Sequence, residues 1–373
     1  MNLKKLNLSL FWKNIHIFLS YFTETLLIQI TQLILTIFSF KYLSNELFYS
    51  IGIVQIIQSL GIIYYDSGVY TIVKSAEYKT PRLRNYWLSI SLYRFLFFYS
   101  IIILISAFNF FLDIYHLNKY YYILIPYIGV TFWAGYITTI IESDGLLSKI
   151  SYIRSVLTSV LSIISAVLIF YFKLDFFYIL QLYIIQIASI ICIIIVFKLN
   201  FTLKKFKRSN LIFLNDKISF TRNNIWMGFL VENFFLIINY VTNQSTSSVA
   251  TFFKLDKYLK VFFGFILGFY QRTFFYIQLQ QKISYSLKKG LVIFALITVL
   301  GLIPLWFVLL HLHHFDFFLY LKLAIFYSAI YCLIFLSFMN TISRNKKTKI
   351  IINLSLFIIL LTYLIITLIY YYK

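Results

Sequence analysis

The sequence predicts an all-α polytopic membrane protein, and two observations lead to this fold class. Hydrophobic residues make up 61% of the 373 residues and charged residues only 12%, whereas soluble domains carry about 25% charged residues. Basic residues also crowd into every second gap between the long apolar segments. A water-soluble core does not account for this composition, so we expect the chain to be integral to a membrane.

Eleven apolar segments are long enough to cross a bilayer as helices. A hydrocarbon core about 30 Å thick needs about 20 apolar residues of helix. These segments lie near residues 16–40, 47–72, 86–112, 120–141, 152–172, 177–199, 222–243, 248–270, 289–311, 317–340 and 350–371. The pattern is compatible with eleven or twelve crossings.

The orientation follows from the basic residues, because Lys and Arg are retained on the cytoplasmic side of short loops. Of the 33 Lys and Arg residues, 24 fall in the N-terminal segment and in the even-numbered gaps. The odd-numbered gaps and the C-terminal end hold only Lys41, Lys119, Lys173, Lys322 and Lys373. We therefore expect a cytoplasmic N-terminus, an uncleaved first helix and cytoplasmic even-numbered loops.

The net charge of +21 does not indicate nucleic-acid binding, because the charge lies in loops between spans. Such residues set the orientation and lie against anionic headgroups. The densest patch, Lys204 to Arg208, is assigned to topology or lipid contact.

Cysteines and histidines give no sign of a cofactor or metal. Cys192 and Cys332 fall in separate spans without metal-ligand or redox spacing, so neither should be bridged. His311, His313 and His314 with Asp316 form a short tract whose spacing matches no common zinc pattern. We interpret it as a solvated external loop and expect neither a cofactor nor a metal.

The longest polar gap, 198–222, divides the chain into two halves. We expect an N-terminal six-helix bundle over 1–200, a basic cytoplasmic linker over 201–222 and a C-terminal bundle of about five or six helices over 223–373. Both halves begin in the cytoplasm, so a pseudo-symmetric repeat would be related by an axis along the membrane normal. Glu24 and Glu232 occupy matching depths in the first helix of each half, which favours the repeat.

Seven charged residues fall inside predicted spans, where each costs at least about 2.5–3.5 kcal/mol and therefore indicates a cavity or a partner. They are Glu24, Arg94, Glu232, Lys254, Asp256, Lys257 and Lys260. Three lysines recur every third residue in span eight and extend through about 9 Å of helix.

This lysine stripe has two interpretations. In the first, Asp256 pairs with Lys260 at i and i+4, Glu232 neutralises one remaining lysine, and the stripe lines a water-filled cavity around a central passage that binds a phosphate-bearing ligand. In the second, span eight begins near Phe262 and the lysines lie in an external loop. The second leaves about nine residues, which is too short to cross a bilayer.

The other buried charges also allow alternatives. Glu24 and Glu232 are candidates for coupling transport to proton uptake through a raised pKa, or for structural hydrogen bonds. Arg94 is a candidate for meeting the ligand or for pairing with Glu24.

Two segments carry a resemblance to a known family. The first runs from Lys41 through Ile51 and ends in the stretch from Ile62 to Tyr70, which contains Asp66, Ser67 and Gly68. The second runs from Ala250 to Lys260. Both resemble polysaccharide repeat-unit flippases of the Wzx type, in the MATE-like superfamily of multidrug, oligosaccharidyl-lipid and polysaccharide exporters.

The resemblance implies two six-helix bundles around a central cationic cavity. Through this cavity an undecaprenyl-diphosphate-linked repeat unit moves from the cytoplasmic to the periplasmic leaflet of the bacterial inner membrane. Lys257 matches the basic position of the family's eighth helix, and Asp66 matches the acidic position that closes its second helix. The chain departs from the family by lacking a clear twelfth span.

The leading hypothesis is therefore a flippase for an O-antigen or capsular unit, which is not an enzyme. Its expected partners are the lipid-linked oligosaccharide, membrane lipids and the polymerase of the same pathway. A membrane-bound polysaccharide polymerase or ligase is the first alternative, but the outward gaps are short for a catalytic loop. An ion-coupled small-molecule exporter is the second, although its cavity should be acidic.

Overall fold

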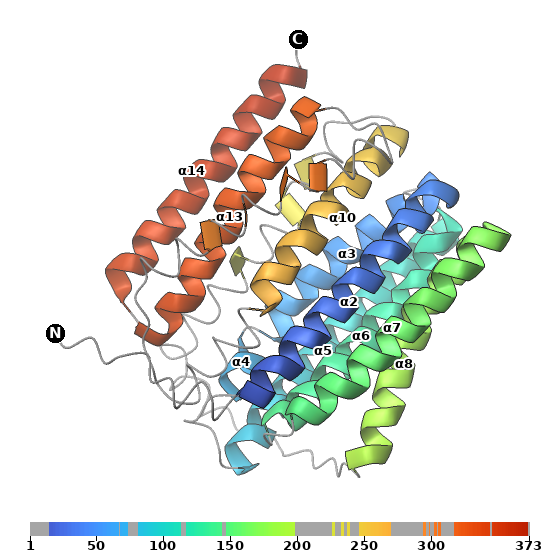
Figure 1. Ribbon diagram of the computed structural model, residues 1–373, viewed down its shortest axis with the longest axis vertical. Helices are drawn as coiled ribbons and strands as arrows, with labels where there is room; N and C mark the ends of the chain where they lie inside the picture. Colours follow the sequence, from blue (N-terminus) through green and yellow to red (C-terminus); the bar gives the residue numbers. More distant parts are fainter. Residues whose placement is uncertain are drawn as a thin grey trace.

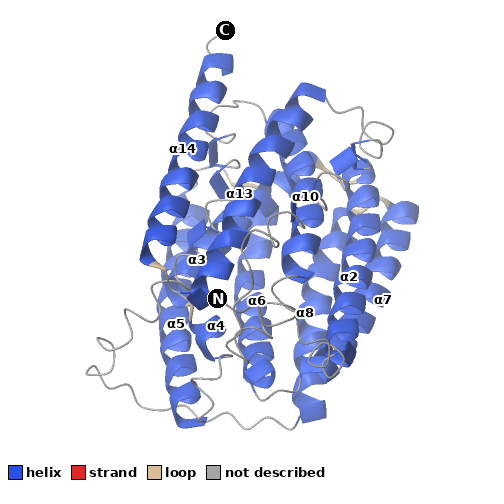
Figure 2. Cartoon of the chain, turned by 60° about the vertical axis from the view of Figure 1, so that its left-hand side comes forward, coloured by secondary structure: helices blue, strands red, loops and turns tan. Residues whose placement is uncertain are grey.

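The computed structural model describes residues 15–66, 68–73, 81–112, 117–143, 147–197, 246–269, 317–343 and 345–371, with a few residues between 226 and 306. Throughout these ranges the regular structure is helical and contains no strand (Figure 2). Within them, eight helices are long and apolar enough to cross a membrane. The all-α polytopic class predicted from composition is confirmed.

The first six predicted spans each correspond to a helix. These helices are α2 (Ile15–Tyr42), α3 (Asn45–Tyr65), α5 (Pro81–Leu112), α6 (Lys119–Ser143), α7 (Leu147–Phe172) and α8 (Asp175–Phe197). A short helix, α4 (Val69–Val73), follows α3 and continues the second predicted span. Pro126 lies inside α6.

The six long helices lie side by side as one group, drawn from blue to green in Figure 1. Helix α2 packs along α7, which packs against α8; α6 contacts α8 and α3, and α5 packs against α3. The outer faces of α5 and α8 carry exposed apolar side chains such as Phe111 and Ile195. Such faces suit acyl chains rather than water.

Three helices are described in the second half: α10 (Thr246–Phe269), α13 (Phe317–Ser343) and α14 (Lys346–Tyr371). By position they correspond to predicted spans eight, ten and eleven; α13 and α14 are among the eight apolar helices of membrane length, whereas α10, with its four charged residues, is not. Helix α10 packs against α2 and α3 on one side and against α13 on the other, and α13 packs against α14. Figure 1 shows α10, in gold, between the blue helices and the pair of α13 (orange) and α14 (red).

The linker 201–222 and most of spans seven and nine lie outside the described residues, so the total of eleven crossings stays a prediction. The described helices nevertheless pack in corresponding pairs. The second and fourth spans pack as α3 with α6 and as α10 with α13, and the fourth and fifth pack as α6 with α7 and as α13 with α14. An internal repeat predicts this correspondence.

One end of the bundle is held together by Asp175, the first residue of α8. Its carboxylate accepts hydrogen bonds from the backbone N–H of Ser44 (2.9 Å), the Ser44 hydroxyl (2.5 Å) and the Tyr120 hydroxyl (2.6 Å). Beside it, the amide of Asn118 donates to Glu46 (2.6 Å). We call this end of the molecule the Ser44 end.

The Ser44 end joins the turn between α2 and α3, the start of α6 and the turn between α7 and α8. These segments belong to the first, third and fifth inter-span gaps, which the charge pattern places together outside the cytoplasm. Their hydrogen bonds put the three gaps at one end of the molecule, as that pattern requires.

Replacing Asp175 by Ala should destabilise the N-terminal helices, because three donors lose a charged acceptor. Hydrogen bonds to charged groups contribute about 1.5–3 kcal/mol each, and the three are not additive, so we expect a loss of about 2–4 kcal/mol. Denaturant unfolding in detergent measures it. Lys119→Gln, a change at an exposed side chain nearby, is the control; equal stability of D175A and K119Q would contradict the prediction.

Candidate functional site

Helix α10 carries four charged residues in its middle, and it is packed on two sides by other helices. Its apolar side chains are almost fully buried: Phe252, Phe253, Leu255, Tyr258, Leu259 and Phe263. The charged side chains share this interior position, since Asp256 is fully buried and the three lysines are partly buried. The lysine stripe therefore belongs to a helix of 24 residues, and not to an external loop.

Asp256 is held by two neighbours. The Lys260 ammonium lies 2.6 Å from its Oδ2, which confirms the pair predicted from the i and i+4 spacing. The hydroxyl of Tyr327, a fully buried residue of α13, donates to Oδ1. Asp256 thus offsets the formal charge of Lys260, and within α10 the lysines still outnumber the acidic residues.

Tyr327 also contributes to an aromatic seam between α10 and α13. Its ring stacks on that of Phe263, with centroids 6.2 Å apart, and Tyr331 stacks on the same Phe263 at 4.8 Å. Sequence reasoning missed Tyr327, because one tyrosine among 32 carries no local signal of its role. The seam fixes α10 to α13.

Lys254 reaches across to the first half of the chain. Its Nζ donates to the backbone oxygen of Phe40 (3.0 Å), in the last turn of α2. The last four carbonyls of a helix have no intrahelical donor, and the C-terminal end carries a partial negative charge. The N–H of Ser44, four residues after Phe40, donates to Asp175 instead. Lys254 therefore caps the C-terminus of α2.

Aromatic rings surround this cap. The Lys254 ammonium lies 5.9 Å from the ring centroid of Phe40 and 5.5 Å from that of Phe48. Phe40 also meets Tyr258 edge-on at 5.3 Å, and Phe48 lies 6.3 Å from Phe253. The two halves of the chain thus contact one another at the Ser44 end.

The lysine stripe begins near one end of the helix bundle. Lys254 lies beside the last turn of α2, so its ammonium is near the Ser44 end, while Lys260 lies about 9 Å further along α10. Lys257, between them, is partly buried, with its Nζ 6.0 Å from the Phe253 ring. The stripe therefore extends inward from the Ser44 end.

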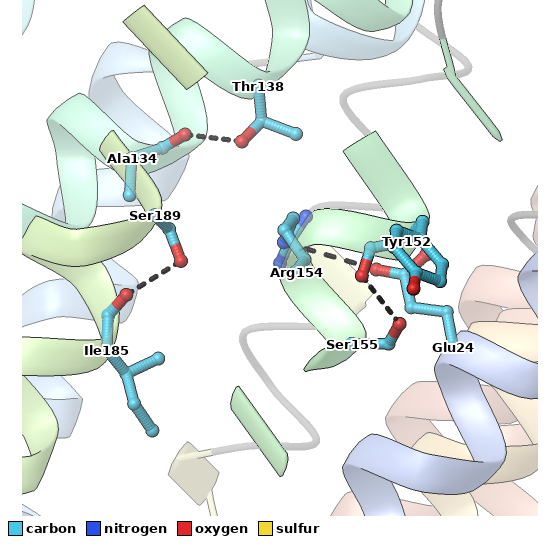
Figure 3. Close-up of polar contacts among 8 residues, drawn as sticks. All are labelled: Glu24, Ala134, Thr138, Tyr152, Arg154, Ser155, Ile185 and Ser189. Atoms are coloured by element: carbon cyan, nitrogen blue, oxygen red, sulfur yellow. Dashed lines mark hydrogen bonds and ion pairs between the residues drawn. The ribbon is translucent and has the colours of Figure 1, made fainter. Parts of the chain in front are cut away.

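Glu24 is buried beside a cation on another helix. It is 1% exposed, and its Oε1 lies 4.0 Å from Nε of Arg154 on α7. Figure 3 shows these two side chains facing one another. Arg154 of α7, rather than Arg94, is therefore the cation beside Glu24, and the alternative that Arg94 takes this place is wrong.

Arg94 lies on α5, which packs against α3, α4 and α6. It is partly exposed, between the exposed Tyr93 and a buried Phe95. It makes no ion pair with a carboxylate in the described part of the chain, and the structure does not bring it to α10. Glu232 lies outside the described residues, so its expected pairing with a lysine of span eight stays a prediction.

Asp66 has a local structural role at the joint between α3 and α4. Its backbone N–H donates to the Ile62 oxygen (3.0 Å), and its Oδ1 accepts from the backbone N–H of Tyr70 (2.8 Å). Its side chain is mostly buried. An aspartate that caps the first turn of a helix is a common stabilising arrangement.

Metal-binding chemistry has no candidate among the described residues, which contain no group of three His, Cys, Asp or Glu placed to hold an ion. The His311 tract lies outside them. Cys192 and Cys332 are both unbridged, as predicted.

Comparisons with known proteins returned no matching family model, curated protein or solved structure. The function must therefore be argued from the residues of the chain.

Asp256→Ala should destabilise the protein strongly, because it leaves the Lys260 ammonium inside the bundle without a counter-charge. Removing one partner of a buried ion pair costs about 3–5 kcal/mol. The double variant Asp256→Ala with Lys260→Met should recover much of this loss, since neither charge remains. The yield of monodisperse protein and unfolding in detergent compare them. If the loss of stability in the double variant equals the sum of the losses in D256A and K260M, the two residues are not coupled.

Proposed function

We propose that the protein is a flippase that moves an undecaprenyl-diphosphate-linked oligosaccharide unit, of O-antigen or capsular type, from the cytoplasmic to the periplasmic leaflet by alternating access. The observation that carries this proposal is the position of the charged residues of α10. A helix of membrane length holds three lysines and one aspartate, and it packs against α2 and α3 of the first half and against α13 of the second.

The charge balance of α10 favours an anionic passenger. Three lysines against one aspartate give α10 an excess of formal positive charge, and its Lys254 lies at the contact between the halves. A diphosphate cannot enter hydrocarbon without compensation, and ammonium groups with little competing water attract it more strongly than they would in bulk solvent. An exporter of organic cations would require the opposite sign.

Lys254 supports a mechanism in which the ligand competes with the protein. In the described conformation its ammonium caps α2 and holds α10 against the first half at the Ser44 end, the predicted periplasmic side. Opening that side requires Lys254 to leave the Phe40 carbonyl. A phosphate oxygen offers the ammonium a full negative charge in exchange for a helix end worth about half a charge. Binding of the ligand's phosphate to Lys254 thus offsets the free-energy cost of opening the Ser44 end, which is the step that releases the ligand.

The polymerase or ligase alternative requires a sizeable catalytic segment outside the membrane. The described turns at the Ser44 end, 43–44 and 173–174, are two residues each, which is too short for such a segment. The proposed protein needs no catalytic side chain, because flipping changes no bond.

Lys257 gives a direct test, since it is partly buried in the middle of the stripe and its Nζ lies 6.0 Å from the ring centroid of Phe253 on its own helix. Lys257→Gln should reduce translocation at least tenfold, and Lys257→Arg should retain most of it, because the charge is what attracts the diphosphate. The measurement is the fraction of lipid-linked repeat units accessible from the periplasmic side, with expression matched. The control is Lys346→Gln, which removes an exposed lysine at the start of α14.

Wild-type translocation by K257Q would remove the support that α10 gives to the proposal. A deletion strain separates the two classes of function. Single repeat units trapped on the cytoplasmic face indicate a flippase, whereas units that reach the periplasm without being polymerised indicate an enzyme.

A further inference from the structure

Two lysines at the Ser44 end converge on one aromatic ring. The Nζ of Lys41, in the last turn of α2, lies 5.4 Å from the ring centroid of Tyr42, and the Nζ of Lys173, in the turn after α7, lies 5.5 Å from the same centroid. Lysines are scarce in the odd-numbered gaps, to which the Ser44 end belongs. Two like charges at one ring therefore need a physical explanation.

The ring between them belongs to an aromatic cluster that joins α2 to α7. Tyr42 stacks on Phe38 (6.4 Å, 11° between planes) and meets Phe170 edge-on (5.9 Å), and Phe38 meets Phe170 edge-on at 5.7 Å. Phe170 is 44% exposed. Aromatic side chains at a helix end, partly exposed and next to cations, suit the boundary between acyl chains and headgroups.

The backbone at Lys173 is unusual. Its φ is 54°, which makes it the one non-glycine residue with positive φ in the described part of the chain. Its N–H donates to the Ile169 oxygen (2.9 Å), so it ends α7 in the left-handed conformation that glycine usually adopts. A lysine in this position carries backbone strain that glycine would not. The side chain, rather than the backbone, therefore explains why a lysine stands here.

Neighbouring carboxylates of the described residues do not form ion pairs with these two ammonium groups. Neither Lys41 nor Lys173 lies within 4.0 Å of a carboxylate oxygen in the residues that the structure describes. The nearest in sequence to Lys173 is Asp175, whose oxygens accept from Ser44 and Tyr120. Both ammonium groups remain exposed.

We propose that Lys41, Lys173 and the Tyr42 ring form a binding site for the phosphate headgroup of an anionic phospholipid. The two ammonium groups bind the phosphate, and one acyl chain lies along the Phe38 and Phe170 rings between α2 and α7. This site is separate from the α10 stripe and does not rest on the proposed transport activity. The lipid serves as a fixed annular ligand where α7 meets α2.

The experiment uses the full chain in nanodiscs of phosphatidylcholine alone, or mixed in equal parts with phosphatidylglycerol. Native mass spectrometry counts the lipids that remain on the released protein. We expect wild type to retain phosphatidylglycerol in preference to phosphatidylcholine, and K41Q/K173Q to lose this preference by at least fivefold. The charge-matched control is K346Q/K347Q, which removes two exposed lysines from the opposite end of the molecule.

Lys173→Gly separates lipid binding from folding. Glycine adopts positive φ without strain, so K173G should unfold at the same temperature as wild type or higher, measured in detergent, while its retention of phosphatidylglycerol falls. Retention at the wild-type level in K173G or in K41Q/K173Q would overturn the site. An equal fall in K346Q/K347Q would also overturn it, because the attraction would then be diffuse.

Discussion

The contact between the two halves depends on where the backbone N–H of Ser44 donates. In a continuing helix it would reach the Phe40 oxygen, but it donates to Asp175, and this leaves the Phe40 oxygen to the ammonium of Lys254. An unpaired backbone group costs several kcal/mol in a membrane interior. A carboxylate on α8 therefore determines indirectly that a lysine from the other half caps α2.

This dependence gives Lys254 a position from which it can respond to charge. A neutral lipid offers nothing stronger than the carbonyl that it would displace, so the cap should stay closed. A diphosphate carries more charge than a helix terminus and competes for the ammonium at equal distance. A ligand shifts a conformational equilibrium only by its differential affinity for the two states. In the proposed mechanism, selection for an anionic head and opening of the Ser44 end have the same physical cause.

The sequence predicted what local geometry determines. Spans follow from the length of apolar segments, and the Asp256–Lys260 pair follows from the helical repeat, because residues four apart share a face. Partners distant in the chain were not predictable: Tyr327 and Phe40 are 71 and 214 residues from the α10 residues that they bind. For the same reason Arg154, rather than Arg94, was found beside Glu24, since helix neighbours are set by side-chain packing between helices. The depth of the lysine stripe also depended on this packing.

The strength of the contacts differs within and between the halves, and this difference bears on motion. In the first half, Asp175 gathers three donors and Glu24 lies beside Arg154, so charged groups join α2, α3, α6, α7 and α8. In the second, the carboxyl group of Asp256 joins α10 to α13 through Tyr327. The described links between the halves are the bond from Lys254 to a neutral carbonyl and ring contacts such as Phe40 with Tyr258. Ring pairs contribute only about 0.5–1.5 kcal/mol each, and hydrogen bonds to carboxylates more. The alternating access that we propose requires α10 to part from α2 and α3, which breaks the Lys254 bond and these ring contacts but neither of the described ion pairs.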